Sequence, residues 1–165
     1  MLGGSPLGLA ALGLRGLDLA PADPGPATLR AAVHARLMGS AALAAVVDDR
    51  VFHARIPQRK DWPAVVFTTP SRSYGSNLGG GDGTSTANVQ VDCWAPTADA
   101  AERAAEAVRL AFHGYRGRVG SVEFLGCFVD DVGEIVTQDS PGKDAWTYRH
   151  LLMIDATHRV PNPTF

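Results

Sequence analysis

The chain has few cysteines and no long apolar run. Cys93 and Cys127 are its only thiols among 165 residues, and both lie among apolar residues, which is typical of buried free cysteines in a reduced cytosolic protein. A disulfide between them is the alternative, although two cysteines do not make the framework that small secreted domains use. No apolar stretch reaches the roughly 18 residues that span a bilayer. The sequence therefore predicts no membrane partner and no disulfide framework.

An excess of either charge sign is also absent. The chain carries 15 Lys and Arg against 17 Asp and Glu, a formal net charge of -2. This balance supplies no broad attraction for nucleic acid or for an anionic membrane. The length of 165 residues is that of one domain with its own hydrophobic core. We therefore predict a single small domain that makes no extensive electrostatic contact with DNA.

Catalytic and metal-binding motifs are missing as well. A phosphate-binding loop requires a lysine and a helix after its glycines, and neither follows the glycines of residues 79–83. The Gly142-Lys143 pair lacks both the upstream glycine and the following Ser or Thr of that motif. No Gly-x-Ser-x-Gly elbow occurs. The histidines stand singly, without metal-ligand spacing: His34, His53, His113, His150 and His158. The sequence thus predicts no enzyme, no catalytic residue, no cofactor site and no metal site.

The remaining polar and aromatic clusters have simple structural interpretations. Asp48-Asp49 and Asp130-Asp131 are adjacent carboxylates, which point apart on a strand, and both pairs are expected in turns. Residues 115–118, Tyr-Arg-Gly-Arg, follow a helix end, so we predict a solvated turn rather than a nucleic-acid contact. The tryptophans are predicted core or subunit-interface residues: Trp62, Trp94 and Trp146.

The clearest pattern is a strand followed at once by a helix. Residues 84–94 alternate, which predicts a half-buried strand. Pro96 interrupts it, Thr97 is a candidate helix cap, and residues 98–113 have helical spacing up to the stop at Gly114. One strand face is apolar: Val89, Val91 and Cys93, opposite Asn88, Gln90 and Asp92. The predicted buried face of the helix is alanine-rich: Ala101, Ala104, Ala105, Val108, Ala111 and Phe112.

The other predicted elements follow from shorter patterns. A helix capped by Thr28 buries Leu29, Ala32, Val33 and Leu37, turns Arg30 and His34 away, and ends at Gly39, and a short helical turn covers residues 41–46. Strands are predicted at residues 51–56, 64–69, 122–129 and 146–154. Residues 71–83 carry five glycines and no periodicity, so they are predicted to form a long flexible loop or the tip of a hairpin. The fold class is α+β: an antiparallel sheet of about four to five strands with two main helices on one face.

The ends of the chain differ from the middle in composition. Residues 1–26 are rich in Leu, Gly and Pro without helical or strand periodicity, and we interpret them as an extension. A start codon assigned too far upstream is the alternative. The predicted domain then covers residues 27–159, and residues 160–165 form a C-terminal tail.

The order of these elements resembles the tail-completion family of long-tailed phages, also called tail terminators or head-to-tail joining proteins. The matching segments are residues 29–33, 42–52, 56–57, 63–66, 89–94 with the helix at 101–114, and 148–154. They cover residues 28–157, and their order carries more information than any single segment. They are patterns of apolar and turn residues rather than catalytic fingerprints.

The resemblance implies a small α+β fold similar to the lambda-type minor tail protein U. It implies a homo-hexameric ring at the head-proximal end of the tail tube, which stops tube polymerisation and joins the tail to the capsid neck. The implied partners are the tail tube protein and a neck stopper or adaptor, with DNA passing through the lumen without specific binding. Such a protein is assembled in the host cytoplasm and resides at the tail-neck junction of a phage, prophage or gene transfer agent particle.

Two other functions stay open at this stage. One is a head-completion adaptor or stopper of the same connector. The other is a small-ligand-binding or enzymatic α+β domain, which needs convergent polar groups in a pocket. Within the leading hypothesis, residues 71–83 are our candidate for an arm that orders only on the tube or the neck.

Overall fold

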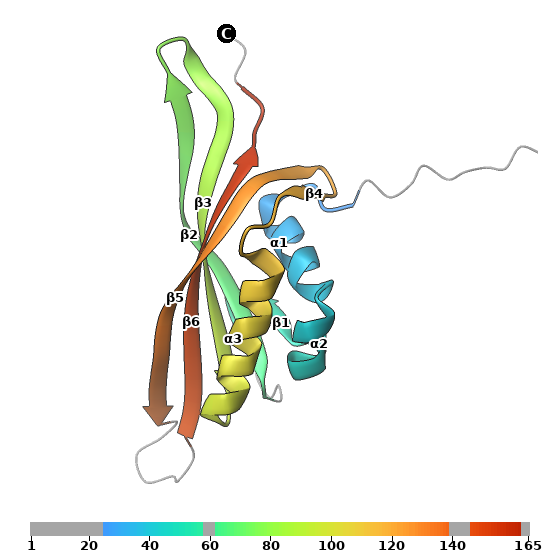
Figure 1. Cartoon of the computed structure of the whole chain (residues 1–165), viewed down its shortest axis with the longest axis vertical. Coiled ribbons are helices and arrows are strands. Elements are labelled where there is room, and N and C mark those ends of the chain that lie inside the picture. Colours follow the sequence, from blue (N-terminus) through green and yellow to red (C-terminus); the bar gives the residue numbers. More distant parts are fainter. Residues whose placement is uncertain (1–24, 58–61, 139–145, 163–165) are drawn as a thin grey trace, which may run out of the picture.

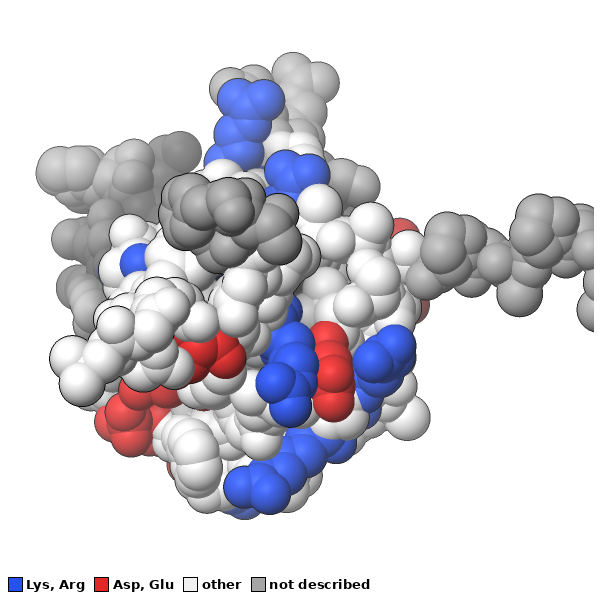
Figure 2. Space-filling model, turned by 90° about the horizontal axis from the view of Figure 1, so that it is seen from above, with Lys and Arg blue, Asp and Glu red and all other residues white. Residues whose placement is uncertain are grey.

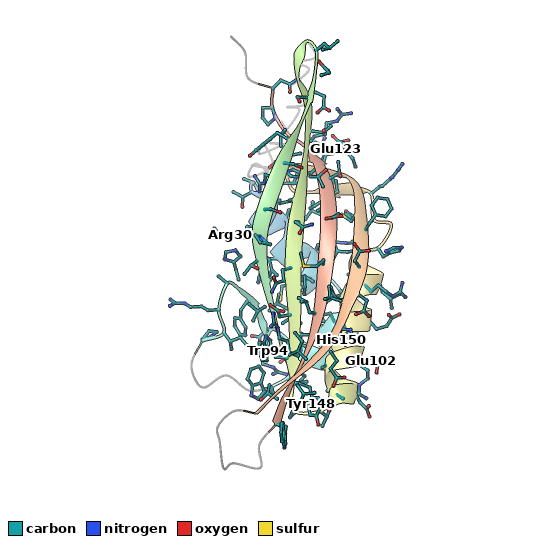
Figure 3. All side chains as sticks on the ribbon, turned by 90° about the vertical axis from the view of Figure 1, so that its left-hand side faces the viewer. Arg30, Trp94, Glu102, Glu123, Tyr148 and His150 are labelled. Carbon is teal, nitrogen blue, oxygen red and sulfur yellow. The ribbon has the colours of Figure 1, made fainter. Side chains whose placement is uncertain are left out.

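A computed structural model describes residues 25–57, 62–138 and 146–162 of the chain. One six-stranded sheet forms a long wall, and three helices lie together on one of its faces (Figure 1). The strand order is β1-β2-β3-β6-β5-β4, with β1 parallel to β2 and every other neighbouring pair antiparallel. None of the described helices lies on the other face of the wall (Figure 3).

The helices are α1 (Leu29–Met38), α2 (Ala41–Val47) and α3 (Ala98–Phe112). Each begins at a hydroxyl side chain that accepts a hydrogen bond from the backbone N–H three residues later: Thr28 from Ala31, Ser40 from Leu43 and Thr97 from Ala100. A cap of this kind contributes about 1 kcal/mol to helix stability. The predicted starts of α1 and α3 are confirmed. Gly114 adopts φ 75°, a left-handed conformation that suits glycine and turns the chain away from α3.

The core lies between the helices and the sheet. All six apolar positions predicted for α3 are buried there, together with Ala107. Val89, Val91 and Cys93 of the central strand are fully buried on the same side. In α1, the predicted residues Leu29, Ala32, Val33 and Leu37 are buried too. The helical and alternating periodicities therefore identified the residues that hold the two layers together.

The strands differ widely in length. Their bounds are β1 (Val51–His53), β2 (Ala64–Asn77), β3 (Gly80–Ala95), β4 (Gly117–Val119), β5 (Val122–Gln138) and β6 (Trp146–Arg159). Strands β3 and β6 form the centre of the wall, where Thr84 to Ala95 pair with Arg159 to Tyr148 without a register shift. This continuous ladder fixes the position of the other strands on both sides.

The α+β class is correct in outline, but the predicted sheet was wrong in two respects. It has six strands rather than four to five, and it is mixed because β1 joins β2 in parallel. Three helices, not two, cover its face. The strand that the sequence did not predict is β4, whose three residues are too few for an alternation to appear. The strand predicted at residues 51–56 is present as β1, but its parallel pairing was not foreseen.

Of the two alternatives predicted for Ser71–Gly83, the long flexible loop is wrong and the hairpin tip is correct, because these residues form the outer part of a hairpin. Strand β2 continues to Asn77 and β3 begins at Gly80, with Arg72 opposite Ala87 and Asn77 opposite Gly80. The turn is closed by the Asn77 side chain, which accepts the Gly79 N–H at 2.8 Å, and by Gly80 at φ 120°. The hairpin projects beyond the helices (Figure 1). No core covers it, so no apolar pattern marked it in the sequence.

Two further expectations need correction. Asp130 and Asp131 lie within β5 rather than in a turn, whereas Asp48 and Asp49 do form the predicted turn after α2. His34 is not turned away from the protein, because its Nε2 lies 3.2 Å from the carbonyl oxygen of Val51. The Gly142-Lys143 pair lies outside the described residues.

The two cysteines are free and buried. Burial raises the pKa of Cys127 from 9.0 to about 11, and burial, with Asp92 and Asp131 adding to it, raises the pKa of Cys93 further. We expect both thiols of the native protein to react slowly with a thiol reagent at pH 8, because the thiolate is the reactive species. Unfolding in guanidinium should release both at once. Rapid labelling of the native protein would contradict this packing.

The same shift has a consequence at high pH. An acid with a raised pKa in the folded state keeps its proton at a pH at which the unfolded chain has already lost it. Raising the pH therefore stabilises the unfolded state relative to the folded state. The contribution of these thiols to stability is therefore complete below pH 9.0, the ordinary thiol pKa, and declines as the pH rises toward 11. A Cys127→Ala variant serves as the control for that part of the decline.

Candidate assembly surfaces

The histidines occupy separate structural positions. His113 Nδ1 accepts the Val129 N–H at 3.2 Å, and the ring of His53 packs against Phe67 with centroids 5.2 Å apart. His150 Nε2 lies 2.8 Å from an Asp131 oxygen, while its buried Nδ1 has no hydrogen-bond partner. Among the described residues, no group of three His, Cys, Asp or Glu is placed to hold a metal ion. No helix in the part described is long and apolar enough to cross a membrane.

The tryptophans and the Tyr115–Arg118 segment are structural as well. Trp62 and Trp94 pack against each other, with ring centroids 6.1 Å apart, while Trp146 is half exposed. The solvated-turn interpretation of residues 115–118 is wrong for Tyr115. The Arg36 guanidinium carbon lies 3.7 Å from the centre of its ring, which packs on Phe124, and Arg118 belongs to β4.

Across the central strands β3 and β6, the helix-free face of the sheet is a hydrogen-bonded polar surface (Figure 3). Across β3 and β6, Thr86 bonds Thr157 at 2.9 Å and the amide of Asn88 donates to the Asp155 carboxylate. Lower down, the Arg149 guanidinium pairs with Asp92 at 2.7 Å and lies 5.4 Å from the Trp94 ring centre. Because these groups satisfy one another, this face presents a fixed polar lining without a surplus of positive charge.

The outer edge of β2 is only partly covered. Strand β1 pairs with Val65–Phe67 and no further. From Thr68 to Asn77, no described strand lies beside this edge, so its alternate backbone N–H and C=O groups face outward. Pro70 lies at a register irregularity within this stretch, and proline is tolerated in sheets mainly at edges.

The outer edge of β5 is open in its other half. Strand β4 pairs with Val122–Phe124, and Gly114 and Tyr115 hydrogen-bond with Cys127. From Asp130 to Gln138, no described strand covers the edge. Three apolar side chains of this stretch are 42–57% exposed, namely Val132, Ile135 and Val136. An exposed edge with apolar side chains is a template for pairing with another chain.

Charge differs between the two ends of the domain. At the upper end, a cavity of about 580 Å³ is lined by Arg30, Arg72, His158 and Arg159, among others. Glu123 pairs there with Arg159 at 3.7 Å and Arg118 at 3.5 Å. Figure 2 looks down on this end and shows basic side chains gathered beside an acidic group. Burial, and to a smaller extent Arg72, lowers the pKa of His158. Within the described residues, no carboxylate pairs with Arg30 or Arg72.

The lower end is acidic by comparison. A smaller cavity of about 170 Å³ between α3 and the sheet is lined by Glu102, Glu106, Asp131 and His150, among others. Arg109 is held by Glu106 at 2.6 Å, and Figure 3 shows Glu102 beside His150. Neither Arg72 nor Glu134 stood out in the sequence, because a lone charge in a polar stretch carries no motif. They become candidate contact residues because Arg72 lies on the uncovered edge of β2 and Glu134 on the uncovered edge of β5.

The comparisons with known proteins agree with this fold. The model of tail completion protein gp17 matches residues 31–158. Among solved structures, a chain from the virion of a native gene transfer agent particle is similar with a TM-score of 0.63 and 21% identity, covering 80% of this chain and 95% of that one. No curated protein matches the sequence. The family match spans most of the domain that the sequence predicted, and the chain belongs to the tail completion protein gp17 family.

Proposed function

We propose that this structural tail protein is a tail terminator, which forms a ring at the head-proximal end of the tail tube. In this role it stops polymerisation of the tube and joins the tail to the neck of the capsid. Its partners are other copies of itself, the tube protein and a neck stopper or adaptor. The family match and a fold shared with a chain of a gene transfer agent virion support this assignment.

The observation that carries the proposal is the pair of uncovered edges at opposite margins of one sheet. Strands β2, β3, β6 and β5 are each antiparallel to the next, so β2 and β5 run in opposite directions. Rotation about a ring axis to which the strands are tilted, by less than a right angle, keeps β2 of one copy and β5 of its neighbour running in opposite directions. The β5 edge of one copy can therefore lie antiparallel to the β2 edge of the next, a heterologous contact of the kind that closes into a ring.

A ring of this kind places one face of the sheet toward the lumen. The helix-free face suits that position, because Asp92, Arg149, Asn88 and Asp155 bind one another rather than leaving free cations. Tight binding of phosphates would slow DNA passage, since affinity rises with each phosphate neutralised. The homo-hexamer, the lumen and the tail-neck location are parts of the proposal that follow the resemblance.

Deletion of the gene in the producing cells tests the function directly. Electron microscopy should show overlong or detached tails beside filled capsids, and a plasmid copy of the gene should restore joined particles of normal tail length. Detached tails of normal length would point instead to an adaptor or stopper of the connector. Normal joined particles in the deletion strain would overturn the proposal.

A further inference from the structure

We infer that the ring is held by a specific joint in which β2 residues Ser71–Ser76 of one copy pair with β5 residues Asp130–Ile135 of the next. The inference rests on the proposed ring and adds the register of its contact. Both segments lie within the uncovered stretches, on edges where no described strand is in the way. They are strands already extended for pairing, so no refolding is needed.

The faces of the sheet restrict the possible register. Arg72 pairs with Ala87, which is fully buried under the helices, so Arg72 lies on the helix-bearing side. Glu134 pairs with His150, which lines the cavity under α3, so Glu134 lies on that side as well. In a continuous sheet, opposed residues share a face. A register that places Arg72 opposite Glu134 satisfies this rule.

Charge complementarity selects that register. Arg72 belongs to the basic upper end and has no ion pair among the described residues, and the same holds for Glu134 at the acidic lower end. Opposite charges directly across an antiparallel pair stabilise it, and like charges destabilise it. Two residues further along, Tyr74 (65% exposed) then lies opposite Val132 (57% exposed), so two exposed apolar side chains cover each other.

A disulfide tests the register in assembled particles. An Arg72→Cys, Glu134→Cys double variant places the thiols across an antiparallel pair, where Cα separations of about 5 Å suit a disulfide. Native Cys93 and Cys127 are buried and do not compete. Mild oxidation of tails should give a ladder of covalent oligomers that ends at the ring size. Each single variant, and Arg72→Cys with Val136→Cys, should give no ladder.

Charge exchange provides an independent measurement. Arg72→Glu and Glu134→Arg should each raise, roughly tenfold, the protein concentration at which half of the chain is assembled, as measured by sedimentation. Combining both changes should restore the original value. The matched controls are Arg103→Glu and Asp99→Arg, exposed charges on α3, which packs mainly on the central strands β3 and β6; both should leave assembly unchanged.

The outcomes separate the two proposals. Rings visible by electron microscopy that form no ladder and ignore the charge exchange would overturn this joint while leaving the terminator function intact. Absence of rings from both purified protein and particles would overturn both. A ladder from Arg72→Cys with Val136→Cys, but not from Arg72→Cys with Glu134→Cys, would overturn the proposed register.

Discussion

Replacing Phe112 by alanine should lower the free energy of unfolding by about 3–5 kcal/mol, the usual cost of truncating a buried phenylalanine. Phe112 is fully buried at the end of α3, where it joins the cluster between helix and sheet. For a domain of this size, the loss corresponds to a fall in Tm of roughly 6–20 °C. Denaturation in guanidinium, followed by circular dichroism, measures it.

Leu110→Ala is the matched control. Leu110 lies on the same helix but is 62% exposed, so its truncation should change stability by less than about 0.5 kcal/mol. A comparable loss in both variants would mean that the effect comes from helix propensity rather than from the core. A fully stable Phe112→Ala protein would contradict the packing of α3 on the sheet.

Shortening the β2–β3 hairpin should leave a folded protein that no longer joins tails to capsids. Ser73 and Thr86 face one another in register, so replacing residues 74–85 by Asn-Gly closes the hairpin with a turn suited to two residues. The core residues Val89, Val91 and Cys93 lie below the cut. Circular dichroism and a cooperative melt should therefore show a native fold, while microscopy shows detached tails.

Leu78→Ser separates the edge from the tip. Leu78 is fully exposed at the turn, and its change leaves the paired strands intact. If the paired edges of β2 and β5 hold the ring, the Leu78→Ser variant should join tails normally. Detached tails with Leu78→Ser would show that the tip contacts the tube or neck, and joined tails with the shortened hairpin would remove the hairpin from the joining contact altogether.

The sequence predicted the parts of the fold that bury apolar surface. The faces of α1, α3 and β3 followed from spacing, because each packs one side against the same core. For the outer hairpin the sequence left a flexible loop and a hairpin tip as alternatives, because no helix of the described residues covers it and its Ser, Thr and Gly residues show no apolar alternation. Asp131 was assigned to a turn although it lies within β5, where its exposed carboxylate lies 2.8 Å from His150 Nε2. This partner is nineteen residues away, so no local pattern in the sequence indicates it.

The candidate site was beyond sequence reasoning for a related reason. An edge is uncovered only by virtue of what its neighbours fail to reach, and that depends on the length of β1 and β4. Arg72 and Glu134 lie on uncovered edges because β1 and β4 end before they reach them. The family resemblance supplied the functional class, while the positions of possible contacts required the strand order.

The two short outer strands have a mechanical consequence for an assembled particle. Strand β1 blocks the lower part of the β2 edge and β4 blocks the upper part of the β5 edge, so adjoining copies meet only when offset along the strands. In the proposed ring the strands must therefore tilt relative to the ring axis. Strand tilt and the width of the lumen are geometrically linked in a closed sheet. Lengthening either short strand would then alter the width of the proposed lumen through this tilt, without changing any residue that faces that lumen.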